Sequence, residues 1–140
     1  MATQWGYGPK TFEVEAGSDQ IVLLKVPHRG TIKQINLQQQ GGADGGGFEI
    51  YDSEAAAKSL VGSSSSSAIE GGEPAAHSIT DGEVAITAGA YRASVDIPYI
   101  NRDGTPTNPV RRLWMRINIT GSGTKQFSLG MLIEPSDLGG

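Results

Sequence analysis

The residue types that most often act in catalysis or bind metals are sparse in this sequence. Its 140 residues include two histidines and no cysteine. His28 lies in a Pro-His-Arg-Gly turn and His77 in a low-complexity stretch, and neither has a second histidine or a carboxylate at the spacing of a metal-binding motif. A cupin-type metal enzyme would place a His-x-His pair on one strand, and the sequence has none. We therefore expect no metal centre, no cofactor and no thiol nucleophile.

Several other stretches match functional motifs only in part. The glycine-rich stretch 41–47 (GGADGGG) lacks the Lys-Ser/Thr pair and the following helix of a phosphate-binding loop, and its Asp44 lacks the alternating acidic ligands of a calcium loop. The serine run at 63–67 is not part of a Gly-x-Ser-x-Gly elbow. The Asp-Gly pairs at 81–82 and 103–104 are typical of turns. These observations predict a protein that is not an enzyme.

The segment 111–119 (RRLWMRINI) carries residue types that are common at binding surfaces. Its aliphatic residues alternate with polar or aromatic ones, which predicts a strand with one buried face. The opposite face presents Arg112, Trp114 and Arg116. Two interpretations of this face stay open. It is either a solvated face on which the arginine stems shield the tryptophan, or the centre of a protein interface, where tryptophan and arginine are enriched.

Aromatic residues suggest two further surfaces. Trp5 and Tyr7 lie within the Gly/Pro-rich residues 1–10, which we interpret as an arm rather than a strand. Aromatics on such an arm either fold back on their own domain or dock onto a neighbouring molecule. A carbohydrate platform would combine Trp114 with another exposed aromatic, although each candidate tyrosine is more typical of a half-buried core position: Tyr51, Tyr91 or Tyr99.

Composition and charge narrow the class of protein. Twenty glycines and seven prolines favour short strands with many turns. The formal net charge of −4 argues against non-specific binding of nucleic acid, which needs a basic surface. The first ten residues lack the apolar core of a signal peptide, and no stretch approaches transmembrane length. We therefore expect neither a nucleic-acid nor a membrane partner.

The spacing of alternating apolar stretches and turns predicts eight strands, at 11–15, 20–26, 31–39, 48–52, 83–87, 92–100, 111–119 and 124–134. A short helix is predicted at 53–61. Together these elements predict an all-β fold, an antiparallel, jelly-roll-like β-sandwich of about eight strands with one short helix. The predicted organisation is an extended N-terminal arm at 1–10, a single sandwich domain at 11–135 and a C-terminal tail at 136–140.

The last two predicted strands are the clearest pair in the sequence. The Gly-Ser-Gly stretch at 121–123 between them tolerates positive φ, so we predict that they form a hairpin. Its aliphatic face needs cover from other strands, because two strands alone are marginally stable. This face is predicted to hold Leu113, Met115, Ile117, Ile119, Phe127, Leu129, Met131 and Ile133.

Four sequence features together carry a resemblance to one family. They are GGGFEIYDSEAAA at 45–57, the late strand RRLWMRINI, the Gly-Ser-Gly turn and the closing strand FSLGMLIEP, and the likeness covers most of residues 31–135. In these features the chain resembles the small capsid decoration (cement) proteins of tailed bacteriophages. The likeness is one of pattern, which other phage sandwich proteins such as fibre or tail modules share.

The resemblance implies a non-enzymatic structural protein of the virion. Such a protein is made in the host cytoplasm, sits on the outer capsid surface, commonly as a homotrimer, and stabilises the capsid by bridging major capsid subunits. The alternative is a glycan- or receptor-binding β-sandwich module of a phage fibre or surface layer. The expected interface residues are Trp5 and Tyr7 in the arm, and Arg112, Trp114 and Arg116 on the sandwich, where the arginine pair would suit an acidic partner.

Overall fold

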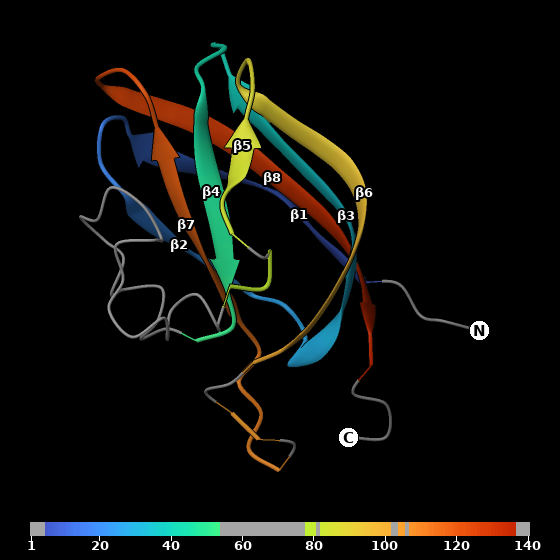
Figure 1. Cartoon of the computed structure of the whole chain (residues 1–140). Coiled ribbons are helices and arrows are strands. Elements are labelled where there is room, and N and C mark those ends of the chain that lie inside the picture. Colours follow the sequence, from blue (N-terminus) through green and yellow to red (C-terminus); the bar gives the residue numbers. More distant parts are fainter. Residues whose placement is uncertain (1–4, 54–77, 81, 102–103, 106, 137–140) are drawn as a thin grey trace.

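The computed structural model describes residues 5–53, 78–80, 82–101, 104–105 and 107–136. These residues contain no helix and form eight strands (Figure 1). The strands are β1 (Trp5–Glu15), β2 (Gln20–Leu24), β3 (Arg29–Gln40), β4 (Gly46–Tyr51), β5 (Val84–Ile86), β6 (Ala90–Ile100), β7 (Leu113–Ile119) and β8 (Thr124–Pro135). Apart from β1, each begins and ends within about two residues of its predicted position. The predicted helix at 53–61 lies outside the described residues, except for Ser53.

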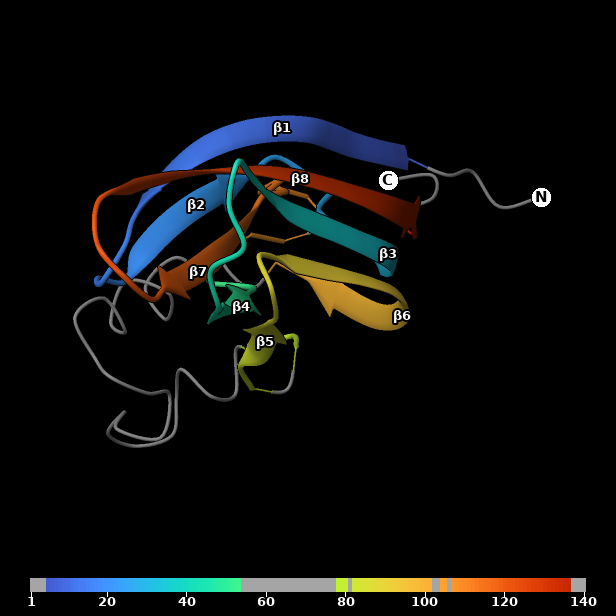
Figure 2. The same ribbon diagram turned by 90° about the horizontal axis from the view of Figure 1, so that it is seen from above.

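The strands form two four-stranded antiparallel sheets that face each other. The first sheet has the order β1-β8-β3-β6 and the second the order β2-β7-β4-β5. Figure 2 shows the two sheets as separate layers. The chain crosses repeatedly from one sheet to the other, and this strand order is that of a jelly roll. The predicted all-β, antiparallel, jelly-roll-like sandwich is therefore confirmed.

The core lies between the two sheets and is built from alternate residues of the strands. The aliphatic row of β7 is fully buried, from Leu113 to Ile119. The inward row of β8, from Phe127 to Ile133, is at most 5% exposed. The row is contiguous with buried side chains of β3 and β4 in one cluster. The predicted inward faces of both strands are therefore confirmed.

Strands β7 and β8 do not form the predicted hairpin. β7 pairs with β2 and β4 in the second sheet, whereas β8 pairs with β1 and β3 in the first. The turn at 120–123 is thus a corner between the two sheets. Because both strands carry one continuous aliphatic row, they bury these rows against each other across the core, and each occupies a central position in its own sheet.

Residues 5–10 are not an arm but the first half of β1. Trp5 pairs with Ile133 and Tyr7 with Met131, and the register then shifts between Tyr7 and Lys10. Gly8 and Pro9 fall in this irregularity, on the edge strand of the sheet, where a proline is tolerated because no ladder hydrogen bond is lost. The glycines and the proline interrupt the alternation of apolar and polar residues, so the sequence pattern did not predict a strand here. Residues 1–4 and 137–140 lie outside the described part of the chain.

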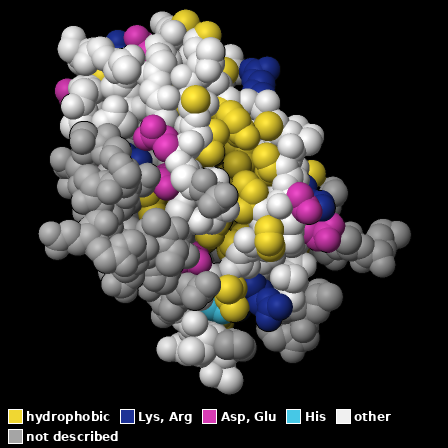
Figure 3. All heavy atoms as spheres, in the orientation of Figure 1, with side chains coloured by type: hydrophobic (Ala, Val, Ile, Leu, Met, Phe, Trp, Pro, Cys, Tyr) yellow, Lys and Arg dark blue, Asp and Glu magenta, His cyan; other side chains and the backbone are white. Residues whose placement is uncertain are grey.

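One side of the sandwich, between β5 and β6, is less completely closed than the rest. β5 has three residues, and β6, the edge strand facing it, has eleven. The inward residues of β6 that precede Tyr99 are therefore only partly buried, as Tyr91, Val95 and Ile97 show. Figure 3 shows apolar side chains at the surface on this side of the molecule.

Candidate functional site

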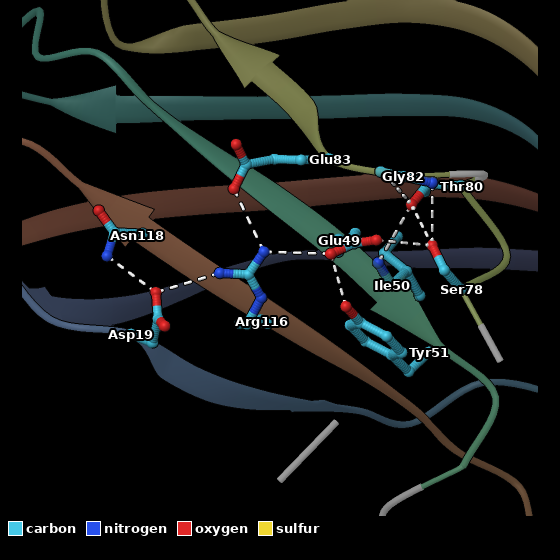
Figure 4. A network of polar contacts seen from close by, with 10 residues as sticks. All are labelled: Asp19, Glu49, Ile50, Tyr51, Ser78, Thr80, Gly82, Glu83, Arg116 and Asn118. Carbon is cyan, nitrogen blue, oxygen red and sulfur yellow. Dashed lines mark hydrogen bonds and ion pairs between the residues drawn. The ribbon is translucent and has the colours of Figure 1, made fainter. Parts of the chain in front are cut away.

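Arg116 is the centre of a buried network of charged groups on the outer face of the second sheet (Figure 4). Its Nη1 donates a hydrogen bond to Asp19 Oδ1 at 3.1 Å, and its Nη2 donates to Glu49 Oε1 at 3.1 Å and to Glu83 Oε2 at 3.2 Å. The side chains of Arg116, Asp19 and Glu49 are at most 2% exposed, and that of Glu83 is 49% exposed. The prediction that Arg116 offers its charge to a partner is therefore wrong.

A second layer of hydrogen bonds holds the carboxylates of this network in place. The Tyr51 hydroxyl donates to Glu49 Oε1 at 2.5 Å, Ser78 Oγ donates to Glu49 Oε2 at 2.9 Å, and Asn118 Nδ2 donates to Asp19 Oδ1 at 2.8 Å. Burial raises the pKa of Tyr51, and its hydrogen bond to Glu49 adds to the shift. The network thus ties β4 and β7 to the residues before β2 and β5, and its role is structural.

Arg116 keeps its charge inside this network. Burial alone would lower the pKa of Arg116, but its hydrogen bond with Glu49 and the nearby charge of Asp19 outweigh burial and raise it. A guanidinium needs several partners when it is removed from water, because an unpaired buried charge is very costly. Three carboxylates pair with the two Nη atoms, whereas the buried Nε has no hydrogen-bond partner among the described residues.

Trp114 is also buried, which removes the predicted platform. It is 3% exposed and packs with Tyr51, against Ile21 and Val110. Its side chain does point away from the aliphatic row, as predicted, but it does not reach solvent. A protein interface or a carbohydrate platform centred on Trp114 is therefore wrong for this chain.

The tyrosines proposed as platform or arm residues belong to the core. Tyr7 and Tyr99 are each 6% exposed, and the Tyr99 hydroxyl donates to the Pro27 carbonyl at 2.9 Å. Tyr91 is half-buried and lies edge-on to Phe48, with ring centroids 5.4 Å apart. The prediction that Tyr7 is a free anchor is therefore wrong, and the half-buried or core interpretation of the tyrosines is correct.

The two remaining predicted interface residues, Trp5 and Arg112, are exposed and line the same groove. This groove, which we call the cationic groove, is open and has a volume of about 580 Å³. It lies at the end of the sandwich where β1 begins and β8 ends. Its lining residues are Trp5, Lys25, Val26, Pro27, Arg111, Arg112 and Pro135.

Strand pairing explains why these distant residues meet. The pairing of Trp5 with Ile133 sets the indole beside the last residues of β8, including Pro135. In the second sheet, the β2–β7 ladder continues beyond Leu24, because the Val26 amide donates to the Arg111 carbonyl at 3.3 Å. The two sheets thus bring the four chain segments to one edge of the sandwich.

The charge of the cationic groove is unbalanced. Lys25, Arg111 and Arg112 are exposed, and no carboxylate of the described residues forms an ion pair with any of them. The chain as a whole carries a net charge of −4, so the groove is a local concentration of positive charge on an acidic protein. Trp5, 37% exposed, adds an apolar surface beside the guanidinium groups. The arrangement can bind carboxylate-bearing groups together with apolar side chains.

Sequence reasoning found two of the seven residues that line this groove. Trp5 and Arg112 were predicted as contact residues, but as parts of two separate surfaces. Lys25, Arg111 and Pro135 were missed. The adjacent arginines at 111–112 were the one available signal, because two neighbouring cations on a strand point to opposite sides and at least one had to be solvated. Lys25 could be placed only through the β2–β7 pairing.

Within the described part of the chain, no group of three or more His, Asp or Glu residues is arranged to hold a metal ion. The same part contains no helix that is long and apolar enough to cross a membrane. The sequence matches no protein-family model, and no curated protein matches it. The cationic groove is therefore the feature of the molecule that bears most directly on function.

Proposed function

We propose that this protein is a non-enzymatic structural protein that binds the outer surface of a phage capsid and stabilises it by bridging major capsid subunits. The observation that carries the proposal is the cationic groove, which joins an exposed tryptophan to three cations that form no ion pair with the described carboxylates. The jelly-roll fold also supports it, because this fold recurs in viral capsid domains. The resemblance to decoration proteins in the segments 45–57 and 111–135 supplies the class of partner.

The groove suits attachment to an acidic protein surface. Tryptophan and arginine are the residue types that most often dominate binding energy at protein interfaces. Unpaired surface cations speed the encounter with an acidic partner and fix its orientation. Copies that associate as a homotrimer would bind with three grooves at once, so that weak individual contacts combine through effective concentration. The partner is the major capsid protein, and the site of action is the virion.

Binding to phage heads tests the proposal. We expect the full chain to co-sediment with purified, undecorated heads of the phage that encodes it. Trp5→Ala and Arg112→Glu should each weaken binding about tenfold or more, because they remove the apolar anchor and reverse one cation. The matched control is Arg92→Glu, the same charge reversal on exposed β6, which should bind as the parent chain does.

Two outcomes would overturn the proposal. The first is a parent chain that does not co-sediment with the heads at all. The second is equal binding by the two groove variants and the control, which would place the contact elsewhere. Light scattering on the purified chain, without heads, should give a mass three times 14.7 kDa if the trimer forms in solution.

A further inference from the structure

We propose a second binding site, for a neutral saccharide, on the outer face of the first sheet. This site is a hollow of about 310 Å³ that lies over β1, β3 and β8. It is separate from the cationic groove and shares no lining residue with it. We call this site the amide hollow. Its lining residues are Gly6, Tyr7, Gly8, Pro9, Gln34, Asn36, Gln38, Ser128, Gly130, Met131 and Leu132.

One wall of the amide hollow is a row of carboxamides on β3. Gln34, Asn36 and Gln38 are exposed and alternate with the buried Ile35 and Leu37, so all three point outward from the sheet. Each carboxamide offers both a donor and an acceptor. Sugar hydroxyls also donate and accept at once, so such a row can bind adjacent hydroxyl groups of one ring. Arg92 donates to Gln38, whereas no described residue hydrogen-bonds to the side chains of Gln34 and Asn36.

The floor of the amide hollow is backbone rather than side chain. Gly130 of β8 pairs with Asn36 of β3, and it faces the irregular part of β1 between Tyr7 and Lys10. A Cβ atom added at Gly130 would contact only the Tyr7 carbonyl, at 3.7 Å, and one added at Gly6 would contact nothing within 4 Å. The two glycines thus leave space for a sugar ring to bind against the backbone. Pro9 and Leu132 supply apolar edges for the C–H face of a sugar.

The absence of charge from this lining selects the ligand class. None of the eleven lining residues is charged at neutral pH: the only titratable one is Tyr7, whose phenol ordinarily ionises near pH 10 and whose pKa burial raises further. A nucleotide, an acidic peptide or a sialylated glycan would lose solvation at its charges, while Arg92 at the edge of the hollow is already engaged by Gln38. The volume is at the lower end of the roughly 300–1,000 Å³ of small-molecule sites, which suits one or two sugar rings.

Chemical-shift mapping by NMR on the full chain tests this site. The probes are neutral gluco-, galacto- and manno-oligosaccharides, with a sialylated oligosaccharide as the charged comparison. We expect at least one neutral probe to bind with a dissociation constant on the order of 1 mM, as suits a shallow site with few contacts. The shifts should be largest at the side-chain amides of Gln34 and Asn36 and at the Gly130 backbone.

Three variants sharpen the test. Gly130→Val fills the hollow from its floor and should abolish binding, while its extended backbone position accepts a β-branched residue. Asn36→Ala is an exposed change that leaves the core intact and should weaken binding about tenfold, so it tests the site even if Gly130→Val misfolds. Gln126→Ala, at an exposed position of β8 outside the lining, is the matched control for the loss of a carboxamide and should bind as the parent chain does.

The inference is overturned if no neutral probe binds at a probe concentration about 10-fold above the expected dissociation constant. It is also overturned if only the sialylated probe binds. A third contrary result is binding of Asn36→Ala and Gly130→Val with the affinity of the parent chain. Co-sedimentation of the same variants with phage heads keeps the two proposals apart. Since the amide hollow and the cationic groove share no residues, Gly130→Val should retain capsid binding, and Arg112→Glu should retain saccharide binding.

Discussion

The outer faces of the two sheets differ in how far their charged side chains are exposed to solvent. On the first sheet, the outer face is exposed, and its ion pair between Lys33 and Asp96, at 2.9 Å, has side chains that are 40% and 76% exposed. On the second sheet, Arg116 and its partners Asp19 and Glu49 are almost completely buried at a similar distance of 3.1 Å. Both faces arise from strands with alternating sequences, so alternation determines which side of a strand faces the core but not whether the other side meets water.

This difference separates two energetic roles for charge. An exposed ion pair contributes little, because water already solvates both partners. A buried ion pair is costly to form, yet the loss of one partner leaves an uncompensated charge away from water. The outer face of the first sheet is therefore free for binding, and that of the second sheet is committed to the integrity of the fold.

The largest effect is expected from Arg116→Met. The change leaves Asp19 and Glu49 buried without their counter-charge, which should reduce the free energy of unfolding by about 3–5 kcal/mol. Urea denaturation followed by fluorescence measures it. The control is Lys33→Met on the first sheet, which should leave the denaturation midpoint where it is in the parent chain. Equal shifts for the two variants would contradict the contrast between the faces.

A smaller effect is expected from Tyr51→Phe. Its hydroxyl donates to the buried Glu49 carboxylate at 2.5 Å, and hydrogen bonds to charged groups contribute about 1.5–3 kcal/mol. We expect the free energy of unfolding to fall by an amount in that range. The matched control is Tyr91→Phe, a half-buried tyrosine whose hydroxyl bonds to no described residue. Loss of stability in the control alone would show that Tyr51 does not support Glu49.

The smallest expected effect is a dependence of stability on alkaline pH. Burial raises the pKa of both Tyr51 and Tyr7, while in the unfolded chain tyrosines ionise near pH 10. Above about pH 10 the unfolded state therefore releases protons that the folded state retains, and stability falls as pH rises through the folded pKa. Absorbance of phenolate near 295 nm should show fewer ionised tyrosines in folded than in urea-unfolded protein. In Tyr51→Phe, the decline in stability with pH should be shallower.

Local patterns in the sequence predicted the strands well but not their partners. The aliphatic rows from Leu113 to Ile119 and from Phe127 to Ile133 lie inward as predicted, because a period of two follows from strand geometry alone. The choice between a hairpin and a corner at 120–123 depends on which strands lie alongside, and no local pattern encodes it. The first half of β1 was missed because Gly6, Gly8 and Pro9 interrupt its alternation.

The burial of Arg116 could not be predicted from the local sequence either, because it depends on contacts with distant segments. Its partners Asp19 and Glu49 lie 97 and 67 residues away in the sequence. An arginine on the polar side of a strand is normally solvated, so without those contacts the expectation of an exposed face was the natural one. The cationic groove likewise joins Trp5 to Arg112 only after both sheets have formed.

The central positions of β7 and β8 have a consequence for biosynthesis. In the first sheet β1 and β3 are joined only through β8, and in the second β2 and β4 are joined only through β7. A nascent chain that has not yet extended past residue 113 thus leaves β1 and β2 with no partner strand. The second sheet can close only after residues 113–119 have left the ribosome, and the first only after residues 124–135, so folding is expected on the millisecond-to-second scale of all-β chains with distant pairings. Chains that stop before residue 113 would therefore expose unpaired apolar strands.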